Sequence, residues 1–221
     1  MKLSISICVT AGLLNDSKFN RVTRYKLRIT GSDGKIETVI NDPGQSRKGI
    51  TLIAHPHPLH GGTLDNKVVQ MVASTLFELG YVAVRPNFRG VGMSEGDYDN
   101  GEGEIEDMLS AANFVKSTYG DLPLILVGFS FGAYIQHNAN ILLRSQQLVL
   151  IAPAVNMFPF GAVPENTLVI HGEQDELVPL AAVQAWAQPY GVEVNVVTEA
   201  DHFFHRKLPQ LKQILVDRCR C

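Results

Sequence analysis

The sequence predicts an α/β fold, in which helices cover both faces of a mostly parallel, eight-stranded sheet. Residues 25–40 alternate apolar and polar side chains on either side of Asp33 and Gly34, which is typical of an antiparallel hairpin. From Gly49 onward, short apolar runs alternate with longer segments of helical spacing. Strands that are apolar on both faces are typical of a parallel sheet buried between helices, so we expect the hairpin to lead into such a sheet.

Six apolar runs form the parallel part of the predicted sheet. Each run is between five and eight residues long, which is an ordinary length for a strand. The runs cover residues 50–54, 81–85, 122–129, 147–153, 167–172 and 192–197. Because open sheets of this class bind ligands at the carboxyl ends of their strands, we look for chemistry in the residues that follow each run.

Three of the segments that follow these runs have helical spacing. Residues 67–80 end on a glycine, as a helix often does, and residues 105–117 and the last segment each carry an apolar stripe. The stripes consist of Ile105, Leu109, Ala112 and Val115 in the second segment, and of Leu208, Leu211 and Leu215 in the third. The chain therefore alternates strands with helices.

Composition favours one domain and excludes some partners. The chain of 221 residues has no linker that would divide it, so residues 23–221 are expected to form a single domain. A formal net charge of -3 leaves no basic surface for nucleic acid. No run approaches the roughly 18 apolar residues that a membrane span needs. We therefore expect neither nucleic acid nor a membrane as a partner.

The two ends of the chain bear on its cellular location. Residues 1–22 are interpreted as an N-terminal arm or an extra strand, because they imitate a signal peptide only poorly. The three cysteines are Cys8, Cys219 and Cys221. Their odd number favours a reducing cytoplasm, and the two at the C-terminus are expected to be solvated thiols rather than metal ligands.

Ser130 is the candidate nucleophile. It lies at the centre of G-x-S-x-G (residues 128–132), where a buried strand gives way to a segment that can be helical. The alternative is a serine that caps the helix N-terminus. A second G-x-S-x-G surrounds Ser94, but no buried strand ends there, so Ser94 is expected to be a loop or capping residue. Arg89, in the same loop, is expected to anchor an ion pair.

A serine needs a base to take its proton and a carboxylate to orient that base. Asp175 follows the strand at 167–172, and His202 follows the next strand. The chain order of serine, aspartate and histidine, each after its own strand, is that of hydrolases with this kind of sheet. The neighbouring alternatives for the two roles are Glu173, Glu176 and His205.

From roughly Arg24 to its end, the chain resembles the cap-less serine α/β-hydrolases, close to a group of short predicted hydrolases. The resemblance is carried by the motifs HPHPLHGGTLDNKVV, RPNFRGVGMSEGDYDNG, VGFSFGAY, HGEQDELVP and ADHFFH. It implies the α/β-hydrolase fold, with Ser130 as nucleophile, Asp175 as acid and His202 as base. It also implies that no metal or organic cofactor is needed. Dienelactone-type relatives use cysteine where this chain has Ser130.

The loop HPHPLHGG (residues 55–62) is interpreted as the oxyanion loop. In this fold the loop after this strand gives one backbone N–H to the substrate oxyanion, and the residue after the nucleophile, Phe131, gives the other. Its prolines have no N–H, which leaves His57 or Leu59, and the likeness to relatives favours His57. His60 is expected on the outside of the loop, and the remaining candidates His137 and His171 are expected to be structural.

These features predict a serine hydrolase that cleaves small soluble carboxylic esters or thioesters through an acyl-enzyme. Only residues 154–166 separate two strands where this fold usually inserts a lid, so no lid domain is expected. Two alternatives remain open. The fold could serve as a non-catalytic binding module, or His55 and His57 could hold a metal ion for metal-dependent hydrolysis, given a third ligand.

Overall fold

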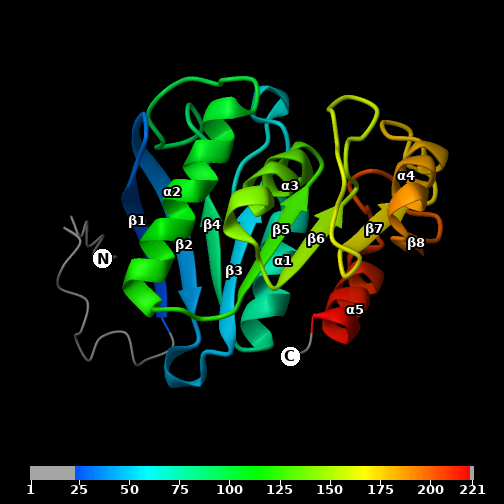
Figure 1. Ribbon diagram of the computed structural model, residues 1–221. Helices are drawn as coiled ribbons and strands as arrows, with labels where there is room; N and C mark the ends of the chain where they lie inside the picture. The colour runs from blue at the N-terminus through cyan, green and yellow to red at the C-terminus, as the bar shows by residue number, and fades with distance from the viewer. Residues whose placement is uncertain (1–22, 220–221) are drawn as a thin grey trace.

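The computed structural model describes residues 23–219, and their eight strands form one sheet (Figure 1). The strands are β1 (Thr23–Gly31), β2 (Gly34–Asp42), β3 (Gly49–Ala54), β4 (Tyr81–Pro86), β5 (Leu124–Phe129), β6 (Gln147–Ile151), β7 (Leu168–Gly172) and β8 (Val194–Val197). Their order is β1-β2-β4-β3-β5-β6-β7-β8. The pairs β1·β2 and β2·β4 are antiparallel and all others parallel, which confirms the predicted mostly parallel sheet with an antiparallel start.

Five α-helices cover the two faces of the sheet. They are α1 (Lys67–Glu78), α2 (Glu102–Tyr119), α3 (Phe131–Leu143), α4 (Leu180–Ala187) and α5 (Leu208–Arg218). The helices α2, α3 and α4 bury their apolar side chains in the core on one face, whereas α1 and α5 pack into the core on the other (Figure 1). Within residues 23–219, no helix is long and apolar enough to cross a bilayer. The predicted arm at residues 1–22 lies outside the described part of the chain.

The apolar stripe predicted for α2 is only partly correct. Ile105 and Leu109 are half-buried, whereas the face that is fully covered carries Glu104, Asp107 and Met108. Glu104 accepts hydrogen bonds from two backbone amides in the turn that precedes the helix, at 2.9 and 2.8 Å. Ala112 and Val115 of the predicted stripe are buried, so the buried face combines part of that stripe with two carboxylates that apolar spacing does not reveal.

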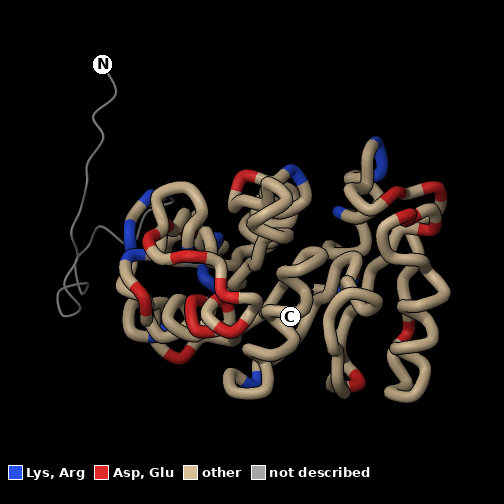
Figure 2. Tube along the Cα trace, turned by 90° about the horizontal axis from the view of Figure 1, so that it is seen from above, with Lys and Arg blue, Asp and Glu red and all other residues tan. Residues whose placement is uncertain are grey.

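The second of these carboxylates, Asp107, holds the loop that follows β4. It accepts three hydrogen bonds from Arg89, one from the backbone N–H at 2.9 Å and two from the guanidinium at 3.2 and 3.0 Å. Seen from above, acidic residues gather over α2 and the loop before it (Figure 2). The guanidinium of Arg89 lies within 4.0 Å of four carboxylates, those of Asp33, Asp99, Glu106 and Asp107. The expected ion-pair role of Arg89 is confirmed.

The C-terminal cysteine Cys219 differs from its prediction. It directly follows α5 and is 1% exposed, packed with Leu211 and Leu215 in the core rather than solvated. The hydroxyl of Tyr81 donates to its carbonyl oxygen at 3.3 Å, which ties the end of α5 to β4. Cys8 and Cys221 lie outside the described residues.

His55, the first residue after β3, joins two loops at the carboxyl edge of the sheet. Its Nε2 accepts a hydrogen bond from the backbone N–H of Phe88, after β4, at 3.0 Å. Its Nδ1 therefore carries the hydrogen and donates to the carbonyl of Pro56 at 2.7 Å. Burial lowers the pKa of His55 to about 4, although the hydrogen bond to Pro56 opposes this shift. The ring is thus neutral in the folded protein at neutral pH.

This depressed pKa predicts an acid-dependent loss of stability. Between pH ~6.5 and ~4 the unfolded chain binds a proton at His55 that the folded protein does not, so stability is present above this window and falls as the pH drops through it. We expect the free energy of unfolding of His55→Gln to fall less steeply, by up to about 1.4 kcal/mol per pH unit. Denaturant unfolding of both proteins at several pH values measures the difference. Equal slopes would contradict the prediction.

Candidate active site

Ser130, Asp175 and His202 meet at the carboxyl edge of the sheet. Ser130 follows β5, Asp175 follows β7, and His202 lies in the loop between β8 and α5. The Nδ1–H of His202 donates to Asp175 Oδ2 at 2.7 Å, which leaves Nε2 as an acceptor for the hydroxyl of Ser130 at 2.9 Å. One continuous chain of hydrogen bonds therefore links carboxylate, imidazole and hydroxyl.

The backbone turns sharply at Ser130. Its φ of 57° and ψ of -117° are strained for a residue with a side chain, and such strain is concentrated at functional sites. The turn fits closely against the end of β3, because a Cβ on Gly132 would lie 2.6 Å from the carbonyl oxygen of His55. Ser130 occupies the N-cap position of α3, yet its side chain makes no capping hydrogen bond. Its hydroxyl faces His202 instead.

The carboxylate of Asp175 is fully enclosed and held on both oxygens. Oδ1 accepts the backbone N–H groups of Leu177 and Val178, at 3.0 and 2.8 Å, while Oδ2 faces His202. Burial alone would raise the pKa of Asp175, but the hydrogen bonds from His202 and from the Val178 amide outweigh it and hold the pKa below its ordinary value. Asp175 therefore stays ionised at neutral pH beside His202.

The loops that carry Asp175 and His202 are joined through their backbones. A Cβ on Gly172, the last residue of β7, would lie 2.5 Å from the carbonyl oxygen of Ala200, so only glycine allows this approach. The amide of Gln174 donates to the same carbonyl at 2.9 Å, and the amide of Glu173 donates to the carbonyl of Val197 at 3.0 Å. These contacts set the spacing between carboxylate and imidazole.

The alternatives weighed for these roles lie elsewhere. The Oγ of Ser94 accepts from the backbone N–H of Glu37 and donates to the carbonyl of Asn87, both at 2.9 Å, so it ties the loop after β4 to β2. Glu173 is exposed and accepts the amide of Glu199, while His205 is exposed and pairs with Asp201 at 2.6 Å. Glu176 is also exposed.

Of the two predicted oxyanion donors, Phe131 directly follows Ser130 in the chain. Phe131 is the first residue of α3, so its N–H has no acceptor within the helix. Of the two candidates in the loop after β3, the amide of Leu59 donates to the ring of His57 at 3.3 Å and is therefore engaged within the loop. The rings of His57 and Phe131 are 4.7 Å apart, so the loop and the start of α3 are in contact.

The imidazoles of this loop are engaged in contacts within the protein. Both ring nitrogens of His55 are hydrogen-bonded, and those of His57 face Leu59 and Tyr98. Burial and the neighbouring His60 lower the pKa of His57. Across residues 23–219, no group of three or more His, Cys, Asp or Glu side chains could hold a metal ion. His60 is exposed, as expected.

Aromatic side chains that the sequence did not single out adjoin the site. Tyr98 accepts the Nε2–H of His57 at 3.3 Å, and its ring lies 5.1 Å from that imidazole. Phe158, after β6, packs on Phe131 at 5.1 Å and stacks with Tyr134 at 5.0 Å. These residues come from three separate segments, so no local pattern could have grouped them.

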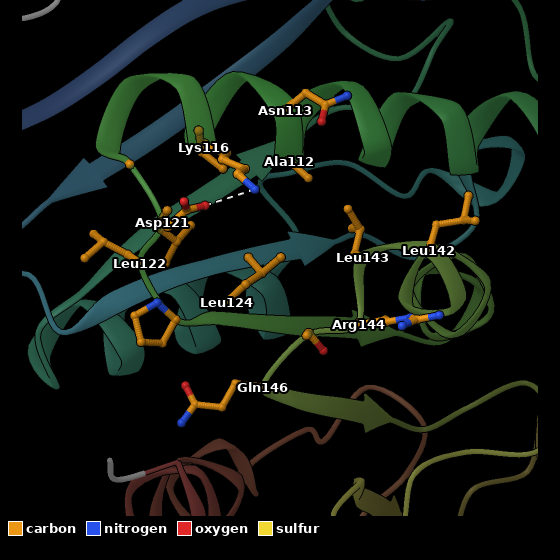
Figure 3. A pocket seen from close by; sticks show the side chains of 15 residues that line it. Ala112, Asn113, Lys116, Asp121, Leu122, Leu124, Leu142, Leu143, Arg144 and Gln146 are labelled. Carbon is orange, nitrogen blue, oxygen red and sulfur yellow. Dashed lines mark ion pairs between the residues drawn. The ribbon is translucent and has the colours of Figure 1, made fainter.

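A cavity of about 500 Å³ lies at the opposite edge of the sheet. Figure 3 shows its lining from α2, the start of β5 and the end of α3, with an ion pair of 2.9 Å between Lys116 and Asp121. Leu124, which lines it, begins the strand that ends just before Ser130. The length of a six-residue strand, about 20 Å, therefore separates this cavity from the hydroxyl of Ser130.

The chain is similar to known hydrolases in sequence and in structure. Residues 54–164 match the protein family described as serine aminopeptidase, S33. The crystal structure of an α/β serine hydrolase without lid from Xanthomonas campestris is 36% identical, with a TM-score of 0.84 over 90% of this chain and 95% of that chain. An α/β serine hydrolase homologue from Coxiella burnetii is 41% identical, with a TM-score of 0.81 over 88% and 96%.

A curated relative extends the comparison. Uncharacterized protein RP471 of Rickettsia prowazekii is 29% identical over an alignment of 216 residues that covers 87% of this chain and 87% of that protein. The family match covers half of the chain, and the structural matches cover nearly all of it. On this likeness the chain belongs to the α/β serine hydrolases, in the family described as serine aminopeptidase, S33.

Proposed function

We propose that the protein hydrolyses small carboxylic esters or thioesters through an acyl-enzyme on Ser130. The observation that supports this most directly is the hydrogen-bond chain from Asp175 through His202 to the Ser130 hydroxyl, at 2.7 and 2.9 Å. A serine held in a strained turn, with a bare imidazole nitrogen facing its hydroxyl, is arranged for nucleophilic attack. The substrate is a small molecule, and we place the reaction in the cytoplasm.

The mechanism follows from the positions of these atoms. The oxygen of Ser130 bonds to the acyl carbon as His202 Nε2 takes its proton, and the carbonyl oxygen becomes an oxyanion. The amides of Phe131 and His57 donate to that oxyanion. His202 then passes the proton to the leaving alcohol or thiol as the bond to the acyl carbon breaks. Water then loses a proton to His202 and attacks the acyl carbon; the bond to Ser130 breaks, His202 returns the proton to the Ser130 oxygen, and the carboxylic acid leaves. Asp175 stabilises the imidazolium in both steps.

An open site suits small, water-soluble acyl groups. In the described chain, residues 152–167 join β6 to β7 without a helix, at the place where larger members of this fold insert a lid. Ser130 is half-buried rather than enclosed. The reaction proposed here needs no metal or organic cofactor, because the proton and the developing charge are handled by the imidazole and the two amides.

The first test is labelling by a fluorophosphonate, read by intact-protein mass spectrometry with EDTA present. We expect one adduct on the wild type and on Ser94→Ala, and none on Ser130→Ala, because only Ser130 faces a bare imidazole nitrogen. Ser94→Ala is a matched control, since it removes a hydroxyl from the second G-x-S-x-G motif. An unlabelled wild type, or an adduct that is lost in Ser94→Ala, would refute the assignment.

Hydrolysis assays of the wild type and of Ser130→Ala can separate ester cleavage from aminopeptidase activity. p-Nitrophenyl acetate reports ester cleavage, and an aminoacyl p-nitroanilide reports the aminopeptidase reaction in the family's name. We expect turnover of the ester by the wild type and none by Ser130→Ala. Turnover of the anilide alone would contradict the proposed substrate class while leaving the nucleophile in place.

The role of Asp175 predicts a large kinetic effect. Asp175→Asn removes the charge that stabilises the His202 imidazolium, so kcat for p-nitrophenyl acetate should fall on the order of 10⁴-fold, as it does when a triad acid is removed in other serine hydrolases. Glu176→Gln changes the next carboxylate along the chain, which is exposed, and should leave kcat within about twofold. Equal effects of the two changes would show that Asp175 is not the acid.

A further inference from the structure

The catalytic proposal leaves one buried histidine of the site without a role. His171 is the penultimate residue of β7 and is 0% exposed, with its ring beside the carboxylate of Asp175. The distance from its Nε2 to Asp175 Oδ2 is 3.5 Å. The sequence predicted only a structural role for His171, and it was not included in the predicted site.

The hydrogen of His171 can be assigned from its partner. Nε2 lies 2.9 Å from the carbonyl oxygen of Val178, and a carbonyl oxygen only accepts, so Nε2 carries the hydrogen and donates it. Asp175 Oδ2 lies 3.5 Å from the same nitrogen, so the carboxylate is close to the imidazole without a hydrogen bond between them. His171 therefore donates to the backbone of Val178 and lies beside the carboxylate of Asp175.

The peptide groups of Val178 are held from two sides. Its N–H donates to Asp175 Oδ1 at 2.8 Å, and its C=O accepts from His171 at 2.9 Å. The turn from Asp175 to Val178 is thus closed by the carboxylate at one end and by the imidazole at the other. Movement of this turn would move Asp175 Oδ2 away from His202, to which it is bonded.

An imidazole at this buried position is otherwise unfavourable. Its Nδ1 is buried and has no hydrogen-bond partner in the described part of the chain, and such an atom destabilises the folded state. An apolar ring would fill the same space without leaving a polar atom unpaired. Burial also lowers the pKa of His171, although the hydrogen bond to Val178 and the charge of Asp175 oppose this shift, so the ring is neutral at neutral pH.

We propose that His171 is a positioning residue of the reaction: its Nε2–H fixes the turn from Asp175 to Val178 and so holds Asp175 toward His202. This inference rests on the proposed function, because it gives His171 a role only through Asp175. A buried side chain that lowers the stability of the folded state is characteristic of a functional site. His171 touches no reacting atom, so its effect must appear through the proton affinity of His202 and through kcat.

Few charged side chains lie close to the carboxylate of Asp175. The titratable side chains in contact with Asp175 are His171 and His202. Glu173, at the end of β7, turns outward to accept the amide of Glu199, and Glu176 is exposed. A change in the pH dependence of labelling in a His171 variant can therefore be attributed to Asp175 and His202.

The test compares His171→Phe, His171→Gln and His171→Asn with the wild type. Phenylalanine fills the space without a donor. The amide nitrogen of glutamine reaches the place of Nε2, whereas that of asparagine reaches only the place of Nδ1. His137→Phe is the matched control, because His137 is also buried and bonds one backbone group, the amide of Gly161, away from Asp175.

Two quantities are measured: kcat and KM for p-nitrophenyl acetate, and the rate of fluorophosphonate labelling from about pH 5 to 9. For His171→Phe we expect kcat to fall about tenfold with KM nearly unchanged. The pH midpoint of labelling should move down by about half a unit, because a looser Asp175 stabilises the His202 imidazolium less. His171→Gln should recover most of both effects and His171→Asn should not, while His137→Phe should match the wild type.

Three results separate this inference from the proposed function. A wild type that takes no adduct would contradict the proposed function itself. A labelled wild type with an unchanged pH midpoint in His171→Phe, or with His171→Gln no better than His171→Asn, would show that His171 only packs. If His171→Phe does not fold, the Gln and Asn variants alone decide, since they are alike in polarity and differ in reach.

Discussion

The approach of backbone to backbone at the carboxyl edge of the sheet is the constraint on which the candidate site depends. At Gly132 the first turn of α3 touches the end of β3, and at Gly172 the end of β7 touches the loop that carries His202. A side chain at either position would separate two segments by more than the tolerance of a hydrogen bond. The parallel sheet brings strand ends to one edge, but these two contacts give the edge its geometry at atomic scale.

Most of the fold could be predicted because its signal is local. Apolar runs and helical spacing occur within single segments, and the strands β3 to β8 lie where the runs placed them. The buried face of α2 was only partly predicted, and the prediction for Cys219 was wrong, for one physical reason. Asp107 is buried because Arg89 pairs with it, and Cys219 is buried because α5 packs against the sheet, and neither contact is written in neighbouring residues.

The candidate site likewise could be predicted where its signal was local, but not where it depends on contacts between distant segments. The sequence could distinguish Ser130 from Ser94, because only Ser130 follows a buried strand and precedes a helix. It chose the amide of His57 over that of Leu59 only by likeness to relatives, because the hydrogen bond from Leu59 to the His57 ring forms only in the folded loop. Tyr98 and Phe158 reach the site from other segments. Contacts of this kind, between segments far apart in the sequence, are seen only in the folded chain.

The chain between β6 and β7, which carries no helix, has a kinetic consequence. In lidded enzymes a closing movement screens the intermediate from solvent, and reopening often limits turnover. An acyl group on Ser130 of this chain would be met by bulk water without such a movement. The lifetime of the intermediate would then be set by how well His202 orients a single water molecule, and product would leave by diffusion. Transfer of the acyl group to an alcohol would have to compete with 55 M solvent, roughly the concentration of liquid water.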